Sequence, residues 1–190
     1  MSGESPLTVT QRSTAASPSE GARPLFFYDL GSPECYLAAE RVMALPVVPE
    51  WVPVDEARLG DGAAVVADAE ARRASVEALA AERHVQPLRW PPGWPADDVR
   101  PALLAATYAK QIGRAVAFSL AAFRQAFAGG RNLGDVDTVL IAAAACEMHP
   151  NAVLKALERR AIGTALDAAT DRAAALGVRS LPALVDGASS

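Results

Sequence analysis

Two short segments, far apart in the sequence, carry residues whose types and spacing could do chemistry. The first is Ser-Pro-Glu-Cys at residues 32–35, directly after an apolar run at residues 25–30. It predicts a strand, a turn, and then a helix whose N-terminus carries a small hydroxyl side chain. The second is Ser-Leu-Pro at residues 180–182, followed by the apolar residues 183–185. A proline entering a strand fits a central ladder poorly unless its peptide bond has a special geometry.

The first segment offers Ser32 as a candidate for binding a thiol. A helix N-terminus stabilises a thiolate through its free N–H groups and the positive end of the helix dipole. A helix start and a proline turn that face each other would therefore form a site for a thiol or thiolate. A simpler interpretation is that Ser32 only caps the helix that Pro33 begins. Spacing alone favours the cap, and the late Leu-Pro turn shifts the balance toward the thiol site.

Cys35 is the other candidate in this segment, one turn into the helix and expected to be buried. Because position 32 is a serine, ordinary dithiol exchange is not available. A buried lone cysteine is more often a small apolar core residue than a nucleophile, which is also what we expect of Cys146. A mechanism with one thiol keeps Cys35 as a candidate.

Composition limits the classes of function. The chain has 190 residues, 51% of them hydrophobic, and a net charge of −4. It is long enough for one domain with a real core. Nothing in its charge suggests a nucleic acid or an anionic membrane as partner. The two histidines are too isolated to predict a metal site.

The N-terminus and the cysteines indicate a compartment. Residues 1–23 are rich in Ser, Thr, Gly, Pro and Ala and predict a disordered tail without a secretory signal. No later segment is long and apolar enough to span a bilayer. Two cysteines make a disulfide framework improbable. We therefore expect a cytoplasmic protein.

The apolar patterns predict strands at both ends of a helical middle. Residues 25–30 predict a buried strand, residues 35–45 a helix ended by a proline, and residues 47–54 an edge strand or irregular extension. Such a β-α-β unit is right-handed by default. Helical patterns then run from residue 63 to Gly177, broken by a Pro- and Trp-rich loop, and residues 181–185 predict the last strand. The expected helix caps are Asp97 or Asp98, Asp135 or Asp137, Asn151, and a capping box at residues 164–167.

These motifs, in this order, resemble the DsbA-like branch of the thioredoxin superfamily. Within it the chain is similar to 2-hydroxychromene-2-carboxylate isomerases and kappa-class glutathione transferases, from about Pro24 to Asp186. The motifs that carry the resemblance are Phe27-Tyr28-Asp29, Ser32-Pro33, Tyr36-Leu37-Ala38, Pro87-Leu88-Arg89-Trp90-Pro91, Trp94-Pro95, Phe123-Arg124, Gly130-Arg131-Asn132-Leu133, Gly177-Val178 and Leu181-Pro182.

The resemblance implies an α/β fold: a thioredoxin-like βαβ core with a long all-helical insertion. The N-terminal half would span residues 24–56, the insertion residues 57–163, and the C-terminal half residues 164–190. Three features depart from the family. Glu34 and Cys35 replace an aromatic residue and a serine, Asp97 stands where many members have asparagine, and the final strand and helix are missing.

The resemblance also implies a function. Ser32 would donate a hydrogen bond to the sulfur of glutathione or another low-molecular-weight thiol. Pro182 would be cis, leaving the backbone of Leu181 free to pair with the peptide-like part of that thiol. Ser180 and Asp97 are further candidates for binding it, although helix capping is the commoner role for Asp97.

The reaction expected is isomerisation or transfer on a small aromatic or organic acid, in a protein that could form a homodimer. One alternative is a thiol–disulfide oxidoreductase in which Cys35 acts alone. Another is a shortened, non-catalytic domain used for binding or oligomerisation.

Overall fold

The computed structural model describes residues 23–59, 69–95 and 98–187. The candidate Asp97 and nearly all of the predicted N-terminal tail lie outside these residues.

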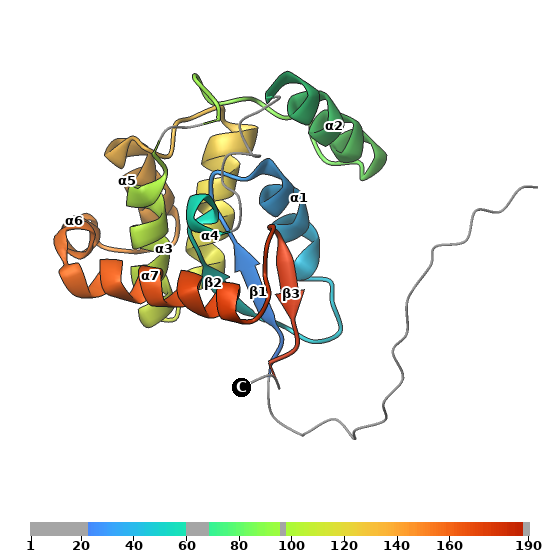
Figure 1. The fold of residues 1–190 in the computed structure, drawn as a ribbon. Helices are drawn as coiled ribbons and strands as arrows, with labels where there is room; N and C mark the ends of the chain where they lie inside the picture. The colour runs from blue at the N-terminus through green and yellow to red at the C-terminus, as the bar shows by residue number, and fades with distance from the viewer. Residues whose placement is uncertain (1–22, 60–68, 96–97, 188–190) are drawn as a thin grey trace, which may run out of the picture.

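The chain begins with the β-α-β unit that its pattern predicts (Figure 1). Strand β1 (Leu25–Tyr28) is buried along its whole length and leads through a short turn into helix α1 (Pro33–Val42). Strand β2 (Glu50–Pro53) follows and pairs in parallel with β1, Phe26 lying opposite Trp51. A proline stands at the first position of α1, where its missing N–H removes no helical hydrogen bond.

The sheet has three strands among the described residues, in the order β2–β1–β3. Strand β3 (Ala183–Val185) lies antiparallel to β1 and brings the C-terminal segment beside the first strand, with Leu184 opposite Phe26. The edge position expected for the second strand is confirmed. Pro53, which has no N–H to donate, can stand at the end of β2 because that strand has a neighbour on one side only.

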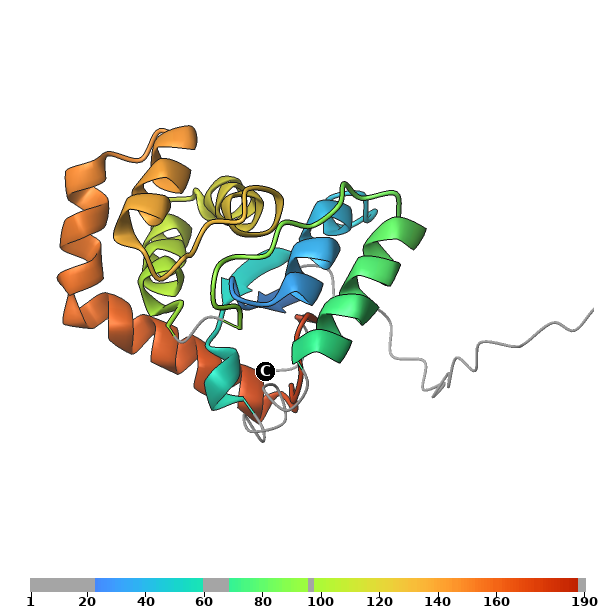
Figure 2. The same cartoon turned by 90° about the horizontal axis from the view of Figure 1, so that it is seen from above.

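Helices make up the rest of the described chain, and most of them form one group beside the sheet. The helical elements after β2 are η1 (Glu56–Arg58), α2 (Ala69–Glu82), α3 (Arg100–Gln111), α4 (Ala115–Phe123), the π-helical turn η3 (Arg124–Ala128), α5 (Val136–Ala145), α6 (Pro150–Glu158) and α7 (Arg160–Ala175). Seen from above, α2 runs alongside α1, on the opposite side of the sheet from α3–α6 (Figure 2).

Two of the predicted caps are wrong. His149, not Asn151, caps α6: its Nδ1 accepts the backbone N–H of Asn151 at 3.2 Å. The capping box expected at residues 164–167 lies inside α7, which begins at Arg160. The pattern Thr-x-x-Asp has capping geometry only at a helix start, and α7 begins one turn earlier because the chain turns at Arg159. Asp135 caps α5 as predicted.

An aromatic cluster joins the sheet to the helical group. The ring of Tyr28 lies 5.4 Å from that of Trp51 and 5.9 Å from that of Phe123 on α4. The hydroxyl of Tyr28 shares a 2.6 Å hydrogen bond with Ser119, also on α4. These buried contacts fix β1 against α4, and so fix the turn that follows β1.

Candidate active site

Ser32 stands at the N-terminus of α1, on the turn that follows β1. Its backbone is extended, and its Oγ accepts the N–H of Cys35 at 3.4 Å, so the predicted helix cap is present. The same hydroxyl donates to Glu34 Oε2 at 3.0 Å. Ser32 is only 1% exposed. The hydroxyl therefore faces the interior of a polar cluster, with its single hydrogen committed to Glu34.

Glu34 connects that turn to helix α2. Arg72 donates two hydrogen bonds to its carboxylate, from Nε at 2.7 Å and from Nη2 at 2.6 Å. Burial pushes the pKa of Glu34 upward, but the hydrogen bonds and charge of Arg72 outweigh it and hold the pKa below its usual range. Arg72 Nη2 also lies 3.9 Å from Glu56 Oε2.

Glu56 links Arg72 to the proline turn. Burial raises the pKa of Glu56, and an interaction of its carboxyl with the backbone N–H of Leu181 offsets a small part of that rise. Ser32 and Leu181 thus belong to one connected group of polar atoms, running through Glu34, Arg72 and Glu56. The two segments singled out in the sequence lie at the same site.

A third carboxyl, that of Asp29, adjoins this cluster and is buried. Asp29 is 4% exposed, and its two oxygens accept the backbone N–H groups of Gly31 at 2.7 Å and Glu56 at 2.8 Å. Burial is the main cause that raises the pKa of Asp29 to about 6. Burial and the neighbouring charge of Asp29 raise the pKa of Glu56 to about 7. The site therefore holds two carboxyl groups that exchange protons near neutral pH.

An aromatic side chain packs over the same turn. Trp94 donates its Nε1 hydrogen to the carbonyl of Gly31 at 3.2 Å, and the Arg72 guanidinium lies 5.4 Å from its ring centroid. Arg73 donates to the carbonyl of Trp94 at 2.8 Å. Helix α2 and the Pro-Trp loop are thereby attached to the serine turn.

The proline turn has the predicted position. The Leu181–Pro182 peptide bond is cis, Leu181 is buried, and Pro182 is exposed. Ser180 is exposed on the preceding turn. The sequence led us to expect a free Leu181 backbone, but its N–H interacts with the Glu56 carboxyl.

The structure gives Cys35 the role of a packing residue. Its side chain is 0% exposed, and burial is the main cause that raises the pKa of its thiol far above the usual range. A thiol in this state is neutral and has no path to an external disulfide. Cys146 lies at the end of α5, also buried, and its Sγ donates to Ala142 and Ala143 carbonyl oxygens. Burial and the raised pKa argue against Cys35 as a nucleophile, and its catalytic role stays a prediction.

Sequence reasoning missed Glu56 and Arg72. A signal for Glu56 existed: it follows β2 just as Asp29 follows β1, and the carboxyl ends of adjacent parallel strands meet at one edge of a sheet. Arg72 gave no signal, because its position depends on how α2 packs against α1.

Neither a metal site nor a membrane-spanning helix is found among the described residues. Over residues 23–59, 69–95 and 98–187, no group of three or more His, Cys, Asp or Glu side chains could hold a metal ion. Within the same ranges, no helix has the length and apolar character needed to cross a membrane.

Comparison with known proteins identifies the family. The family model for the DSBA-like thioredoxin domain matches residues 25–188. Searching the curated proteins returned no match.

Solved structures share the fold at low sequence identity. A 2-hydroxychromene-2-carboxylate isomerase superposes with a TM-score of 0.74 at 18% identity, covering 86% of this chain and 85% of its own. A probable DsbA oxidoreductase from Streptomyces coelicolor superposes with a TM-score of 0.70 at 20% identity, covering 90% of this chain and 82% of its own. The thioredoxin-like α/β fold expected from the sequence is confirmed.

Proposed function

Since this chain belongs to the DSBA-like thioredoxin domain family, we propose that it is a thiol-dependent isomerase or transferase. Its cofactor is glutathione or another low-molecular-weight thiol, and its substrate a small aromatic or organic acid. The observation that carries this proposal is the hydroxyl of Ser32 at the N-terminus of α1, in one polar cluster with the Leu181 amide.

Ser32 orients and acidifies the thiol. The Ser32 hydroxyl, which now donates its hydrogen bond to Glu34, would donate it to the bound sulfur instead. Glu34 keeps its two hydrogen bonds from Arg72. The N-terminus of α1 favours the negative charge on that sulfur. When bound, the thiol would supply a nucleophilic sulfur for isomerisation or transfer on the acid.

Leu181 holds the peptide-like part of the thiol. Its N–H now faces the Glu56 carboxyl, so a carbonyl of the incoming thiol must replace that carboxyl. Because the pKa of Glu56 is about 7, protonation of Glu56 near neutral pH weakens its hold on this N–H and eases the exchange.

Access to the site requires side chains to move. Ser32 is 1% exposed, so a thiol reaches its hydroxyl only after neighbouring groups withdraw. Trp94 packs beside the turn and donates to the Gly31 carbonyl, so its side chain is the one that must withdraw.

The oxidoreductase alternative fits less well. It requires Cys35 to attack a disulfide as a thiolate, yet that thiol is buried and its pKa is raised. No second cysteine stands close enough to resolve a mixed disulfide, because Cys146 belongs to the far helical group.

Isothermal titration with glutathione tests the proposal. We expect the wild-type protein to bind it, Ser32→Thr to retain binding because the hydroxyl remains, and Ser32→Ala to bind at least tenfold more weakly. Absence of glutathione binding, and of binding by other cellular thiols, would contradict the proposal and favour a non-catalytic domain.

A further inference from the structure

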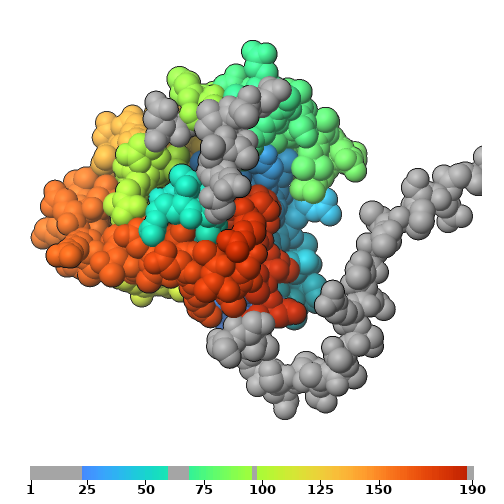
Figure 3. Space-filling view, in the orientation of Figure 1, coloured from blue at the N-terminus to red at the C-terminus, as the bar shows by residue number. Residues whose placement is uncertain are grey.

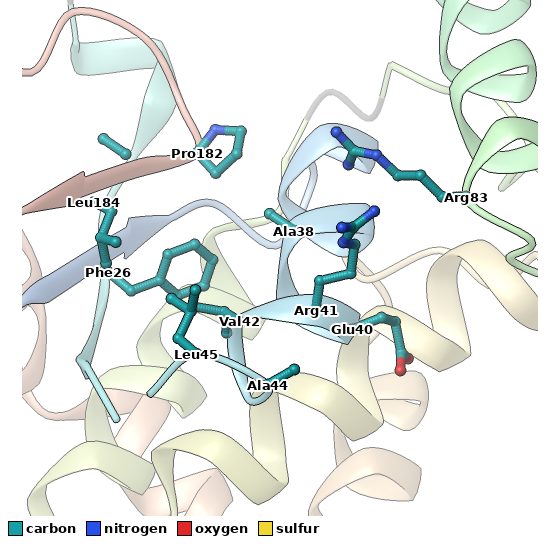
Figure 4. Close-up of a pocket in the computed structure, with 11 residues that line it drawn as sticks. Phe26, Ala38, Glu40, Arg41, Val42, Ala44, Leu45, Arg83, Pro182 and Leu184 are labelled. Atoms are coloured by element: carbon teal, nitrogen blue, oxygen red, sulfur yellow. The ribbon is translucent and has the colours of Figure 1, made fainter. Parts of the chain in front are cut away.

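A pocket of about 620 Å³ lies between α1, β3 and the end of α2 (Figure 4). Its volume is in the range of sites for small molecules. It differs from the polar cluster described above, because none of the connected polar residues lines it: Ser32, Glu34, Glu56, Arg72 and Leu181. The apolar side chains that form its wall are Phe26, Ala38, Val42, Leu45, Pro182 and Leu184.

Two arginines line this apolar wall without a partner. Figure 4 shows the guanidinium groups of Arg41 and Arg83 extending from neighbouring helices toward the same opening. The acidic residue of the pocket, Glu40, points away from it and is held by Arg124 at 2.8 and 2.9 Å. Across the described part of the chain, neither Arg41 nor Arg83 forms an ion pair, so the pocket carries two uncompensated positive charges.

The apolar wall is itself incompletely covered. Leu184 is 53% exposed and Leu45 40% exposed, although both belong to a wall that includes the buried Phe26. Exposed apolar side chains are unfavourable in water, and the arginines beside them can hydrogen-bond an anion, so the pocket suits a ligand with both an apolar and an anionic part.

We propose that this pocket binds a small organic anion with an apolar body. The anionic head lies between Arg41 and Arg83, whose guanidinium groups hydrogen-bond carboxylate or phosphate oxygens. The apolar body covers Phe26 and Leu184. The proposal does not rest on the thiol-handling function, because its anion-binding groups, Arg41 and Arg83, are not part of the polar cluster. The pocket adjoins the proline turn through Pro182, which belongs to its apolar wall.

Decanoate, used below its micelle concentration, is the probe for this site. We expect saturable binding by titration calorimetry, with Arg41→Gln and Arg83→Gln each about tenfold weaker because each removes one charge-assisted contact. Arg160→Gln is the matched control: it makes the same change of charge at the start of α7, away from the pocket, and should bind like wild type. Decyltrimethylammonium, with the same chain and opposite charge, should not bind.

A second variant tests the apolar half of the site. Leu184→Asp places a negative charge on the exposed wall of the pocket and should abolish decanoate binding while the protein stays folded, since that side chain is 53% exposed. Equal binding of decanoate and the cation, or an equal loss in Arg160→Gln, would overturn the proposal. So would concentration-dependent self-association that Leu184→Asp abolishes, because the face would then be an interface between copies.

Discussion

Ser32 donates its hydroxyl hydrogen to Glu34 across 3.0 Å, and that relationship decides how the site can work. A serine hydroxyl has one hydrogen to donate. Any sulfur bound at this helix N-terminus must therefore compete with a carboxylate that Arg72 already holds in place. The account predicts a site that is closed by its own acidic side chains until a thiol displaces them.

Glu56 competes with the thiol for the Leu181 amide, so its removal should strengthen binding. We expect Glu56→Gln to bind S-methylglutathione severalfold more tightly than wild type at pH 8, since a neutral amide is a weaker acceptor than a carboxylate. At pH 6 the two proteins should differ little, because the pKa of Glu56 is about 7 and its carboxyl is then largely protonated. S-methylglutathione is the suitable probe because it has no ionisable thiol. Weaker binding by Glu56→Gln at pH 8 would mean that Glu56 helps to bind the ligand.

Arg72 neutralises two carboxyl groups, so its loss should destabilise the fold. Arg72→Met keeps the apolar stem that packs near Trp94 and removes the charge. We expect the free energy of unfolding to fall by about 2 kcal/mol, as for a partly buried charge left without its partner. Urea denaturation measures this. Adding Glu34→Gln to the same variant should recover part of the loss, and additive effects would show that the pair is not coupled.

Stability should fall as the pH rises through the range in which Asp29 titrates. Its pKa in the folded protein, about 6, lies above its ordinary value of 3.8. The folded state thus binds a proton that the unfolded state has already released, so the stabilisation is complete below pH 4 and is lost as pH approaches 6. The loss is on the order of 3 kcal/mol, at about 1.4 kcal/mol per pKa unit.

Asp29→Asn is the variant that isolates this effect. Urea denaturation at a series of pH values should give a shallower decline in stability between pH 4 and pH 6 for the variant than for wild type. Asp186→Asn changes an exposed carboxyl and should keep the wild-type profile. An unchanged slope in Asp29→Asn would show that another group dominates the pH dependence.

Cys35 should be dispensable for thiol binding. We expect Cys35→Ala to lose about 1 kcal/mol of stability through lost packing, and to bind glutathione with unchanged affinity. A disulfide-reduction assay on both proteins separates the alternatives. Reduction by wild type that disappears in Cys35→Ala would support the oxidoreductase function instead.

Much of the fold could be predicted because the signals for it are local. The apolar run 25–30, the proline at position 33 and the alternation of strand and helix gave the β-α-β start, and β1, α1 and β2 follow it closely. The caps predicted at Asn151 and residues 164–167 have suitable residue types, but these residues lie inside helices and not at their starts. Cap residues are also common inside helices, and only the path of the chain at Arg159 decides where α7 begins.

The site could be predicted only in part. The family resemblance pointed to Ser32 and Pro182, and the structure joins their segments. The partners that hold Ser32 and Leu181 came from nonlocal packing: Arg72 reaches Glu34 across 38 residues of sequence. The division into an insertion and two halves, the shortened C-terminus and the identity of the thiol stay predictions.

The pKa of the bound glutathione thiol tests the central claim most directly. It can be measured from the ultraviolet absorbance of the thiolate as a function of pH, with the protein in excess over the ligand. We predict a pKa clearly below that of free glutathione in wild type and in Ser32→Thr. In Ser32→Ala, at a protein concentration high enough to bind nearly all the glutathione, the pKa should return toward the free value. A thiol that binds with an unshifted pKa, or whose shift survives in Ser32→Ala, would contradict the account.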